Sequence, residues 1–103
     1  MERSILHSRK RIRDTELEYY IISEDIARAH CSLKYYGAKI IKTVRRAEGK
    51  TVESTQINNI FYRRQDIEDF IERIAAENTE PSELHGAAER SIADSVKKAR
   101  KSA

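Results

Sequence analysis

The stretch "RRQDIEDFIERIAAENT" (residues 63–79) decides the fold class, because the spacing of apolar residues changes within it. Its apolar residues recur at intervals of three and four, which places them on one face of a helix. They are Ile67, Phe70, Ile71, Ile74 and Ala75. Upstream, apolar residues alternate with polar ones, as in half-buried strands. A chain that places strands first and helices last is expected to be α+β.

Three segments before this helix predict strands, because β-forming residues dominate them. They are "TELEYYIIS" (15–23), "LKYYGAKIIKTV" (33–44) and "TVESTQINNIF" (51–61). Gly37 inside the second strand indicates a bulge or a close approach by a neighbour. "RRAEGK" (45–50) predicts a hairpin tip, whereas "EDIARAHCS" (24–32) fits either one helical turn or a long connection. The simplest topology is a three-stranded antiparallel meander.

A second helix is expected after residue 80. Pro81 suits its first turn, with Thr79 or Glu80 near the cap. Three apolar residues share one face of this helix: Leu84, Ala88 and Ile92. We expect both C-terminal helices to pack on one face of the sheet, the first covering it and the second lying beside the first.

The charge is segregated along the 103 residues, although the net charge is only +3. Residues 1–13 hold five basic residues and one acid, and residues 97–103 hold four basic residues and no acid. Residues 14–96 hold 11 basic and 16 acidic residues. We therefore expect a flexible basic N-terminal arm (1–13), a single α+β domain (14–96) and a basic C-terminal tail (97–103).

The meander predicts a basic end of the sheet. The start of its first strand lies beside the end of the second, so Arg13 is expected near Arg45 and Arg46. The candidate polyanion-binding residues are Arg9, Lys10, Arg11, Arg13, Arg45, Arg46 and Lys50. Such a cluster attracts polyanions by counterion release. It also arises where a chain end serves only solubility.

The adjacent tyrosines at 19–20 and 35–36 point to opposite faces of the sheet in each pair. If the helices cover one face, the other presents Tyr20 and Tyr35 as candidate partner-binding or stacking residues. One interpretation is a stacking platform for single-stranded nucleic acid. The favoured one is a cross-strand pair or part of a dimer contact.

No motif in the sequence indicates an enzyme, a metal site or a cofactor. His30 and Cys31 are adjacent, but no second cysteine lies at the spacing of zinc ligands. The three glycines are far apart, so no phosphate-binding Gly-rich loop is present. Arg63 and Arg64 precede the first helix, where they fit either an anion site or ion pairs with Glu68 or Asp69; pairing is favoured. We expect a protein that is not an enzyme and has no cofactor.

Four short motifs resemble those of a family of small bacterial proteins known only as a domain of unknown function. They are "YYII" (19–22), "YG-x-K-I" (36–40), "DIEDFIERI" (66–74) and "NTEPSEL" (78–84). The resemblance covers roughly residues 16–94 and leaves both basic ends outside. It implies a cytoplasmic protein with the order strand–strand–strand–helix–Pro–helix and supplies no activity. The sequence departs from the family where "FYRR" precedes the first helix, a position usually capped by Ser or Asp.

These observations predict an uncharacterised, non-enzymatic interaction or regulatory module in a bacterial cytoplasm. It is expected to bind a protein partner or itself through the sheet face that the helices leave uncovered. The alternative is a nucleic-acid-associated protein that uses the basic arm and the hairpin tip. No apolar run approaches the ~20 residues needed to span a bilayer, so no membrane association is expected.

Overall fold

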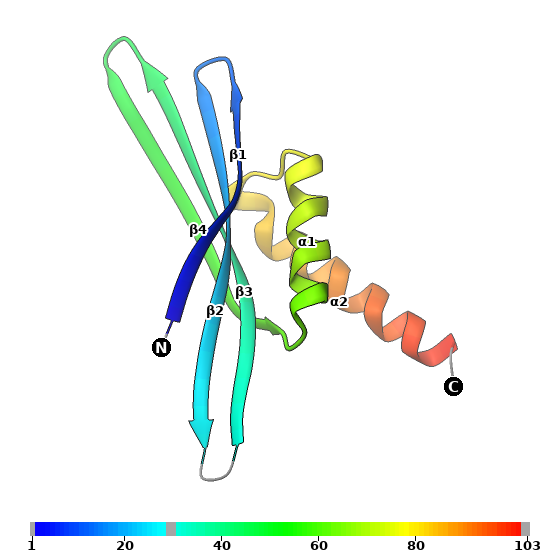
Figure 1. Ribbon diagram of the computed structural model, residues 1–103. Coiled ribbons are helices and arrows are strands. Elements are labelled where there is room, and N and C mark those ends of the chain that lie inside the picture. The colour runs from blue at the N-terminus through cyan, green and yellow to red at the C-terminus, as the bar shows by residue number, and fades with distance from the viewer. Residues whose placement is uncertain (1, 29–30, 102–103) are drawn as a thin grey trace.

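The computed structural model describes the backbone of residues 2–28 and 31–101 and the side chains of residues 2–26 and 33–94. In this part of the chain, one antiparallel sheet has the strand order β1-β2-β3-β4, and the helices follow it (Figure 1). The strands are β1 (Glu2–Ile12), β2 (Thr15–Arg28), β3 (Cys31–Arg46) and β4 (Gly49–Phe61). The helical elements are α1 (Arg64–Ala76), the 3-10 turn η1 (Pro81–Glu83) and α2 (Leu84–Lys101). The α+β class and the meander are confirmed, but the expected number of three strands is wrong.

The fourth strand, β1, is formed by residues that the sequence analysis places in a basic arm. It pairs with β2 from Glu2 opposite Glu24 to Ile12 opposite Thr15, with a bulge between Leu6 and Ser8. Nearly all of its side chains are exposed. The strand therefore joins the sheet through its backbone, and the alternation of apolar residues that marks a half-buried strand is missing from its sequence.

β2 and β3 continue as a two-stranded ribbon through the segment that was expected to be a helical turn or a long connection. Their register runs without interruption from Glu24 opposite Tyr35 to Arg28 opposite Cys31. The pairing of β1 begins only at Glu24, and that of β4 ends opposite Tyr36. The ribbon consequently projects beyond the rest of the sheet, as Figure 1 shows.

Gly37 allows β4 to bulge against β3. Tyr36 pairs with Phe61 and Ala38 with Ile57, so residues 58–60 lie opposite Gly37 alone. A Cβ atom on Gly37 would stand 2.0 Å from the carbonyl oxygen of Ile57. The expectation of a bulge and a close approach at this glycine is confirmed, and only a residue without a side chain fits.

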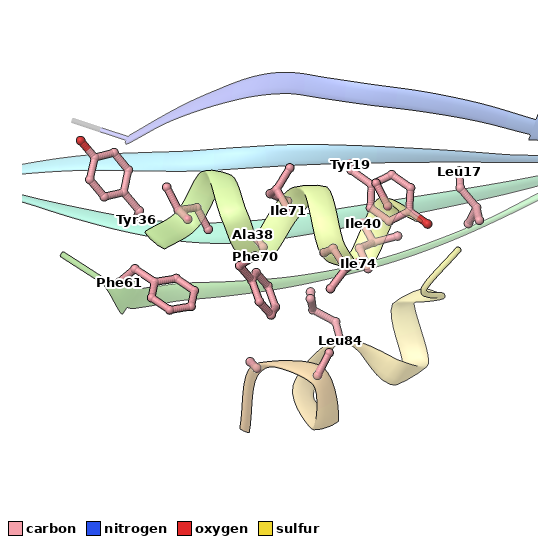
Figure 2. Packing of buried hydrophobic residues seen from close by; sticks show 14 residues of the cluster. Leu17, Tyr19, Tyr36, Ala38, Ile40, Phe61, Phe70, Ile71, Ile74 and Leu84 are labelled. Atoms are coloured by element: carbon pink, nitrogen blue, oxygen red, sulfur yellow. The ribbon is translucent and has the colours of Figure 1, made fainter. Parts of the chain in front are cut away.

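The core lies between α1, the start of α2 and one face of the sheet, which we call the helical face (Figure 2). The sheet contributes Leu17, Tyr19, Tyr36, Ala38, Ile40 and Phe61. The apolar stripe of α1 is confirmed, because all five of its residues are buried. The rings of Phe61 and Phe70 have centroids 5.4 Å apart, which ties the end of β4 to the middle of α1.

The second helix begins as the sequence predicts, at a cap that precedes Pro81. Glu80 is the N-cap of η1, and its backbone N–H donates to Oε1 of Glu83 at 3.0 Å in a capping box. Leu84 and Ala88 are buried, whereas Ile92 is 44% exposed. The expected apolar face of α2 therefore packs only in its first turns, and the later turns extend away from the sheet (Figure 1).

Within residues 2–28 and 31–101, no helix lies on the other face of the sheet, which we call the open face. Ile22 lies on it opposite Gly37 and is nevertheless only 1% exposed. Across this face, Nε2 of Gln56 on β4 donates to Oε1 of Glu2 on β1 at 2.5 Å. β1 and β4 are the two edges of the sheet, so they would lie far apart if the sheet were flat. The contact between them requires the sheet to twist and curl strongly. The curvature lets the sheet bury Ile22 without a second layer.

Candidate functional site

The basic end of the sheet consists of the β1–β2 turn and the β3–β4 hairpin tip. Arg13 occupies the first turn with a φ of 55°. The backbone N–H of Arg45 donates to the carbonyl oxygen of Asp14 at 2.8 Å, so the two turns lie side by side. Arg45 in turn pairs with Lys50 across the hairpin. The structure thus brings Arg13, Arg45 and Lys50 together.

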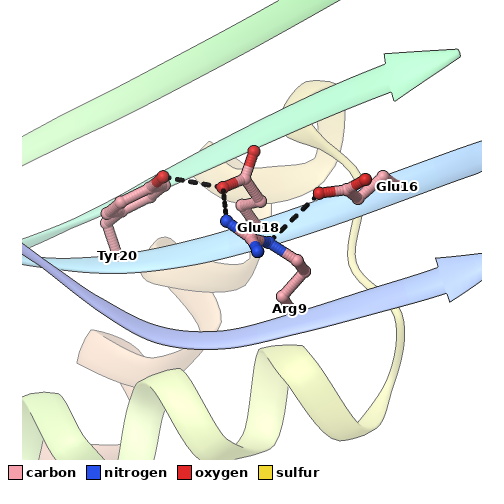
Figure 3. A network of polar contacts seen from close by, with 4 residues as sticks. All are labelled: Arg9, Glu16, Glu18 and Tyr20. Carbon is pink, nitrogen blue, oxygen red and sulfur yellow. Dashed lines mark hydrogen bonds and ion pairs between the residues drawn. The ribbon is translucent and has the colours of Figure 1, made fainter.

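Arg9 belongs to a network on the open face and not to the basic end (Figure 3). Its Nε lies 3.1 Å from Oε1 of Glu16, and its Nη2 lies 3.1 Å from Oε2 of Glu18. The hydroxyl of Tyr20 donates to the same Oε2 at 2.8 Å. Partial burial acts to raise the pKa of Glu18, but the hydrogen bonds from Tyr20 and Arg9 outweigh it and lower this pKa. Two carboxylates therefore offset the charge of Arg9.

The side chain of Lys10 lies on the helical face and binds the C-terminal end of α1. Its Nζ donates to the carbonyl oxygen of Ala75 and, at 3.1 Å, to Oδ1 of Asn78. A cation at a helix C-terminus satisfies carbonyl groups that have no partner within the helix and complements the helix dipole. Lys10 is thus a structural residue, and sequence reasoning had no means of finding its acceptors.

Five of the seven candidate polyanion-binding residues remain: Arg11, Arg13, Arg45, Arg46 and Lys50. All five are exposed, and no ion pair is recorded for them among the described side chains. Asp14 and Glu48 lie in the same two turns. The excess of positive charge at this end is therefore smaller than a count of basic residues indicates.

A groove of about 500 Å³ separates this basic end from the connection between α1 and η1. Ile12, Leu17 and Val44 form its apolar part, while the remaining lining includes Arg13, Asp14, Arg46, Asn78, Glu80 and Glu83. Oε1 of Glu80 accepts from Nζ of Lys42 at 2.5 Å, so one wall is tied to the sheet. The groove exists because the strands run past the last turn of α1. The mixture of charges favours no single class of small ligand.

Tyr20 and Tyr35 both lie on the open face, but they are separated. Their partners across the β2–β3 pair are Lys39 and Glu24, so about 13 Å of strand rise lies between them. The ring of Tyr35 packs against that of Tyr62, with centroids 5.2 Å apart and planes at 66°. Sequence reasoning missed Tyr62, although its place directly after β4 marks it as a neighbour of the projecting ribbon.

Large apolar side chains are exposed at several places along the open face within the described residues, and Ile5 and Ile12 are exposed on the helical face. Those on the open face are Leu6 (41% exposed), Leu33 (40%), Val52 (55%) and Tyr62 (70%). The register places the first three on the face of Tyr20 and Tyr35, and the ring contact places Tyr62 beside Tyr35. Leu33, Tyr35 and Tyr62 lie at the end from which the ribbon projects, and we call these three residues the ribbon patch.

The remaining candidates form no site within the described part of the chain. Three or more His, Cys, Asp or Glu side chains nowhere gather there as they would around a metal ion. His30 lies outside the described residues, as does the side chain of Cys31. Arg64 donates from Nε to Oε1 of Glu68 at 2.9 Å, which confirms the pairing interpretation for this arginine. Arg63 is the N-cap of α1 and provides no side-chain cap.

Comparisons with known proteins place the chain in a family. In the described residues, every helix is too short or too polar to cross a membrane. Searches of curated proteins and of solved structures gave no significant match. Residues 3–94 match a family described as a family of unknown function, DUF6514. The match confirms the resemblance and begins before residue 16, so it includes β1. The chain therefore belongs to this family of unknown function.

Proposed function

We propose that the chain is a small non-enzymatic interaction or regulatory module of the bacterial cytoplasm that binds a protein partner through the open face. One observation carries the proposal: both helices lie on the same side of the sheet (Figure 1), while the ribbon patch exposes Leu33 and Tyr62 together on the other side. Clusters of exposed apolar residues mark interaction surfaces in soluble domains more often than single ones do.

The ribbon patch supplies the anchor in this proposal. Aromatic side chains dominate the binding energy of protein interfaces, since each buries a large area with few rotatable bonds. Among the described side chains, Tyr62 is the most exposed of the large apolar residues, at 70%, and the ring of Tyr35 packs against one side of its ring. A partner that covers Tyr62 would also reach Leu33 on the ribbon.

The polar network on the same face supplies specificity. Arg9 is held by Glu16 and Glu18, and Tyr20 is held by Glu18. Side chains that are already fixed lose little conformational freedom when a partner approaches. The network thus resembles the polar rim of an interface, and the ribbon patch resembles the apolar centre.

The test is a capture experiment with matched surface variants. Wild type, Leu33→Ser/Tyr62→Ser and Ile92→Ser are used as baits in lysate of the source organism, and bound proteins are quantified by mass spectrometry. Ile92, on α2, is exposed to almost the same degree as Leu33, so its variant controls for the loss of an apolar surface residue. A specific partner is expected to be retained by the control and reduced about tenfold or more by the open-face variant.

Two results would contradict this proposal. One is a partner that the open-face variant retains as well as wild type does. The other is equal loss in the Ile92→Ser control. Circular dichroism of each bait verifies its fold before capture.

The alternative function is nucleic-acid binding at the basic end. The observation that favours it is the hydrogen bond from Arg45 N–H to the Asp14 carbonyl, which joins two turns that carry exposed basic side chains. Charge on fixed turns can follow a phosphate backbone at low entropic cost. Removing residues 1–13 is not a clean test, because it removes a strand of the sheet.

Substitution of the hairpin arginines tests this alternative. Fluorescence anisotropy with mixed-sequence DNA and RNA is measured at several salt concentrations. Arg45→Gln/Arg46→Gln is expected to weaken binding and to reduce the slope of log affinity against log salt by about two. Arg64→Gln, away from this end and ion-paired with Glu68, is the control. An affinity that does not depend on salt concentration, or one that the Arg64→Gln control lowers as much as Arg45→Gln/Arg46→Gln does, would rule the alternative out.

A further inference from the structure

The two edges of the sheet differ in how they resist pairing with another strand. β1 carries four basic side chains and a bulge beside His7: the basic residues are Arg3, Arg9, Lys10 and Arg11. Charged residues and bulges are the means by which natural edge strands avoid edge-to-edge association. The β1 edge is therefore well protected.

β4 has its bulge at residues 58–60, so the segment before the bulge lacks this protection. Residues 51–58 contain one charged side chain, Glu53, and neither proline nor glycine. Their pairing with β3 is regular from Gly49 to Ile57, and residues 49–54 are exposed. On such an edge, alternate backbone N–H and C=O groups point outward without a strand to receive them. Figure 1 shows this hairpin standing clear of both helices.

We propose that β4 pairs with β4 of a second copy of this chain, antiparallel and with the two-fold axis at Ser54, so that two four-stranded sheets become one continuous sheet. The inference uses the backbone of a sheet edge and not the ribbon patch. It therefore stands independently of the proposed function.

The sequence of β4 is self-complementary in this register. Glu53 lies opposite Thr55 of the second copy, Val52 lies opposite Gln56, and every cross-strand pair keeps its side chains on one face. No two like charges meet. Moving the axis by one residue to Glu53 would place two carboxylates directly opposite each other, which is destabilising. Glu53 thus excludes this neighbouring register.

Polar side chains at the ends of the paired segment fit the same arrangement. In this register, Lys50 of the second copy reaches the start of the β4 bulge at Asn58, next to Gln56. The side chain of Gln56 donates to Oε1 of Glu2 and to Oδ1 of Asn58. Each end of the interface therefore places Lys50 beside the polar side chains of Asn58 and Gln56, the second of which contacts Glu2. The 55% exposed side chain of Val52 would also lose contact with water.

Matched lysine substitutions on the two edges test the inference by sedimentation equilibrium. Ser54 and Ser4 are both exposed open-face residues, on β4 and β1 respectively. Wild type and Ser4→Lys are expected to be dimers. Ser54→Lys places two ammonium groups opposite each other and should raise the dimer dissociation constant about tenfold or more. A monomeric wild type at high micromolar concentration, or equal dissociation of both variants, overturns the inference.

A disulfide trap tests the register in a protein that keeps its native surface charges. In a Cys31→Ser background, Ser54→Cys places two thiols on the axis, where Cα atoms of a hydrogen-bonded pair lie about 5.5 Å apart and within disulfide range. Mild oxidation is expected to link Ser54→Cys into a dimer and to leave Ser4→Cys unlinked; the reverse result contradicts the register. Leu33→Ser/Tyr62→Ser should leave the dimer intact, so failure of this inference is distinguishable from failure of the proposed function.

Discussion

Replacing Gly37 by alanine is expected to lower the free energy of unfolding by about 3 kcal/mol or more, a large effect for one methyl group. The new Cβ would lie 2.0 Å from the carbonyl oxygen of Ile57 and 2.9 Å from Cα of Asn58. Both are backbone atoms of the β4 bulge, so no flexible side chain can move aside. Urea unfolding followed by circular dichroism measures the change.

Gly86→Ala is the matched control for this prediction. A Cβ on Gly86 would meet only the flexible guanidinium of Arg90, at 3.6 Å. Alanine is the better helix former, so this variant is expected to gain about 0.5–1 kcal/mol. If Gly37→Ala also retained wild-type stability, β4 would not approach β3 as closely as the bulge requires.

Removing the hydroxyl of Tyr19 is expected to cost about 2 kcal/mol of stability, because Tyr19→Phe leaves a buried carbonyl without its donor. The Tyr19 hydroxyl donates to the carbonyl oxygen of Thr79 at 2.9 Å, and both residues are buried. This bond holds the connection between α1 and η1 onto β2. Tyr20→Phe, whose hydroxyl lies in the more exposed network on the open face, should cost less in the same urea titration.

Alkaline pH is expected to lower the stability of the fold by deprotonating the same Tyr19 hydroxyl. Burial, followed by the charges of Glu80 and Glu83, raises the pKa of Tyr19 from 10.0 to about 12. The unfolded chain therefore loses this proton at lower pH than the folded protein does. The stabilising contribution is complete below pH 10 and disappears as the pH rises through about 12. Parallel pH profiles of wild type and Tyr19→Phe over this range would contradict the assignment.

The sequence predicts those parts of the fold in which buried apolar residues recur at regular spacing. The stripe from Ile67 to Ala75 identifies α1, and Pro81 marks the start of the next helical segment. Gly37 could be interpreted because an interior glycine in a strand has few explanations. β1 could not be found in this way, since its side chains are almost all exposed and its contribution comes from backbone hydrogen bonds.

In the candidate site, too, some features can be predicted from the sequence and others cannot. The adjacency of Arg13 and Arg45 follows from the meander alone, because antiparallel neighbours bring those chain positions together. The partners of individual charges do not follow from topology. Arg9 faces two carboxylates and Lys10 faces the end of α1, although the two residues are neighbours in a single basic run. Their separation depends on the alternation of side chains along a strand that the sequence does not reveal.

The contacts of Lys10 also bear on the order in which the molecule assembles. Its two acceptors lie 65 and 68 residues further along the chain, and the partner of Glu2 lies 54 residues away. Contacts of such long sequence separation form late, because a large loop must close first. During synthesis, β1 leaves the ribosome before β2, β3 and β4, yet it acquires these contacts only after β4 and α1 have emerged. β1 can therefore pair with β2 early, while its contacts with β4 and α1 are among the last to form.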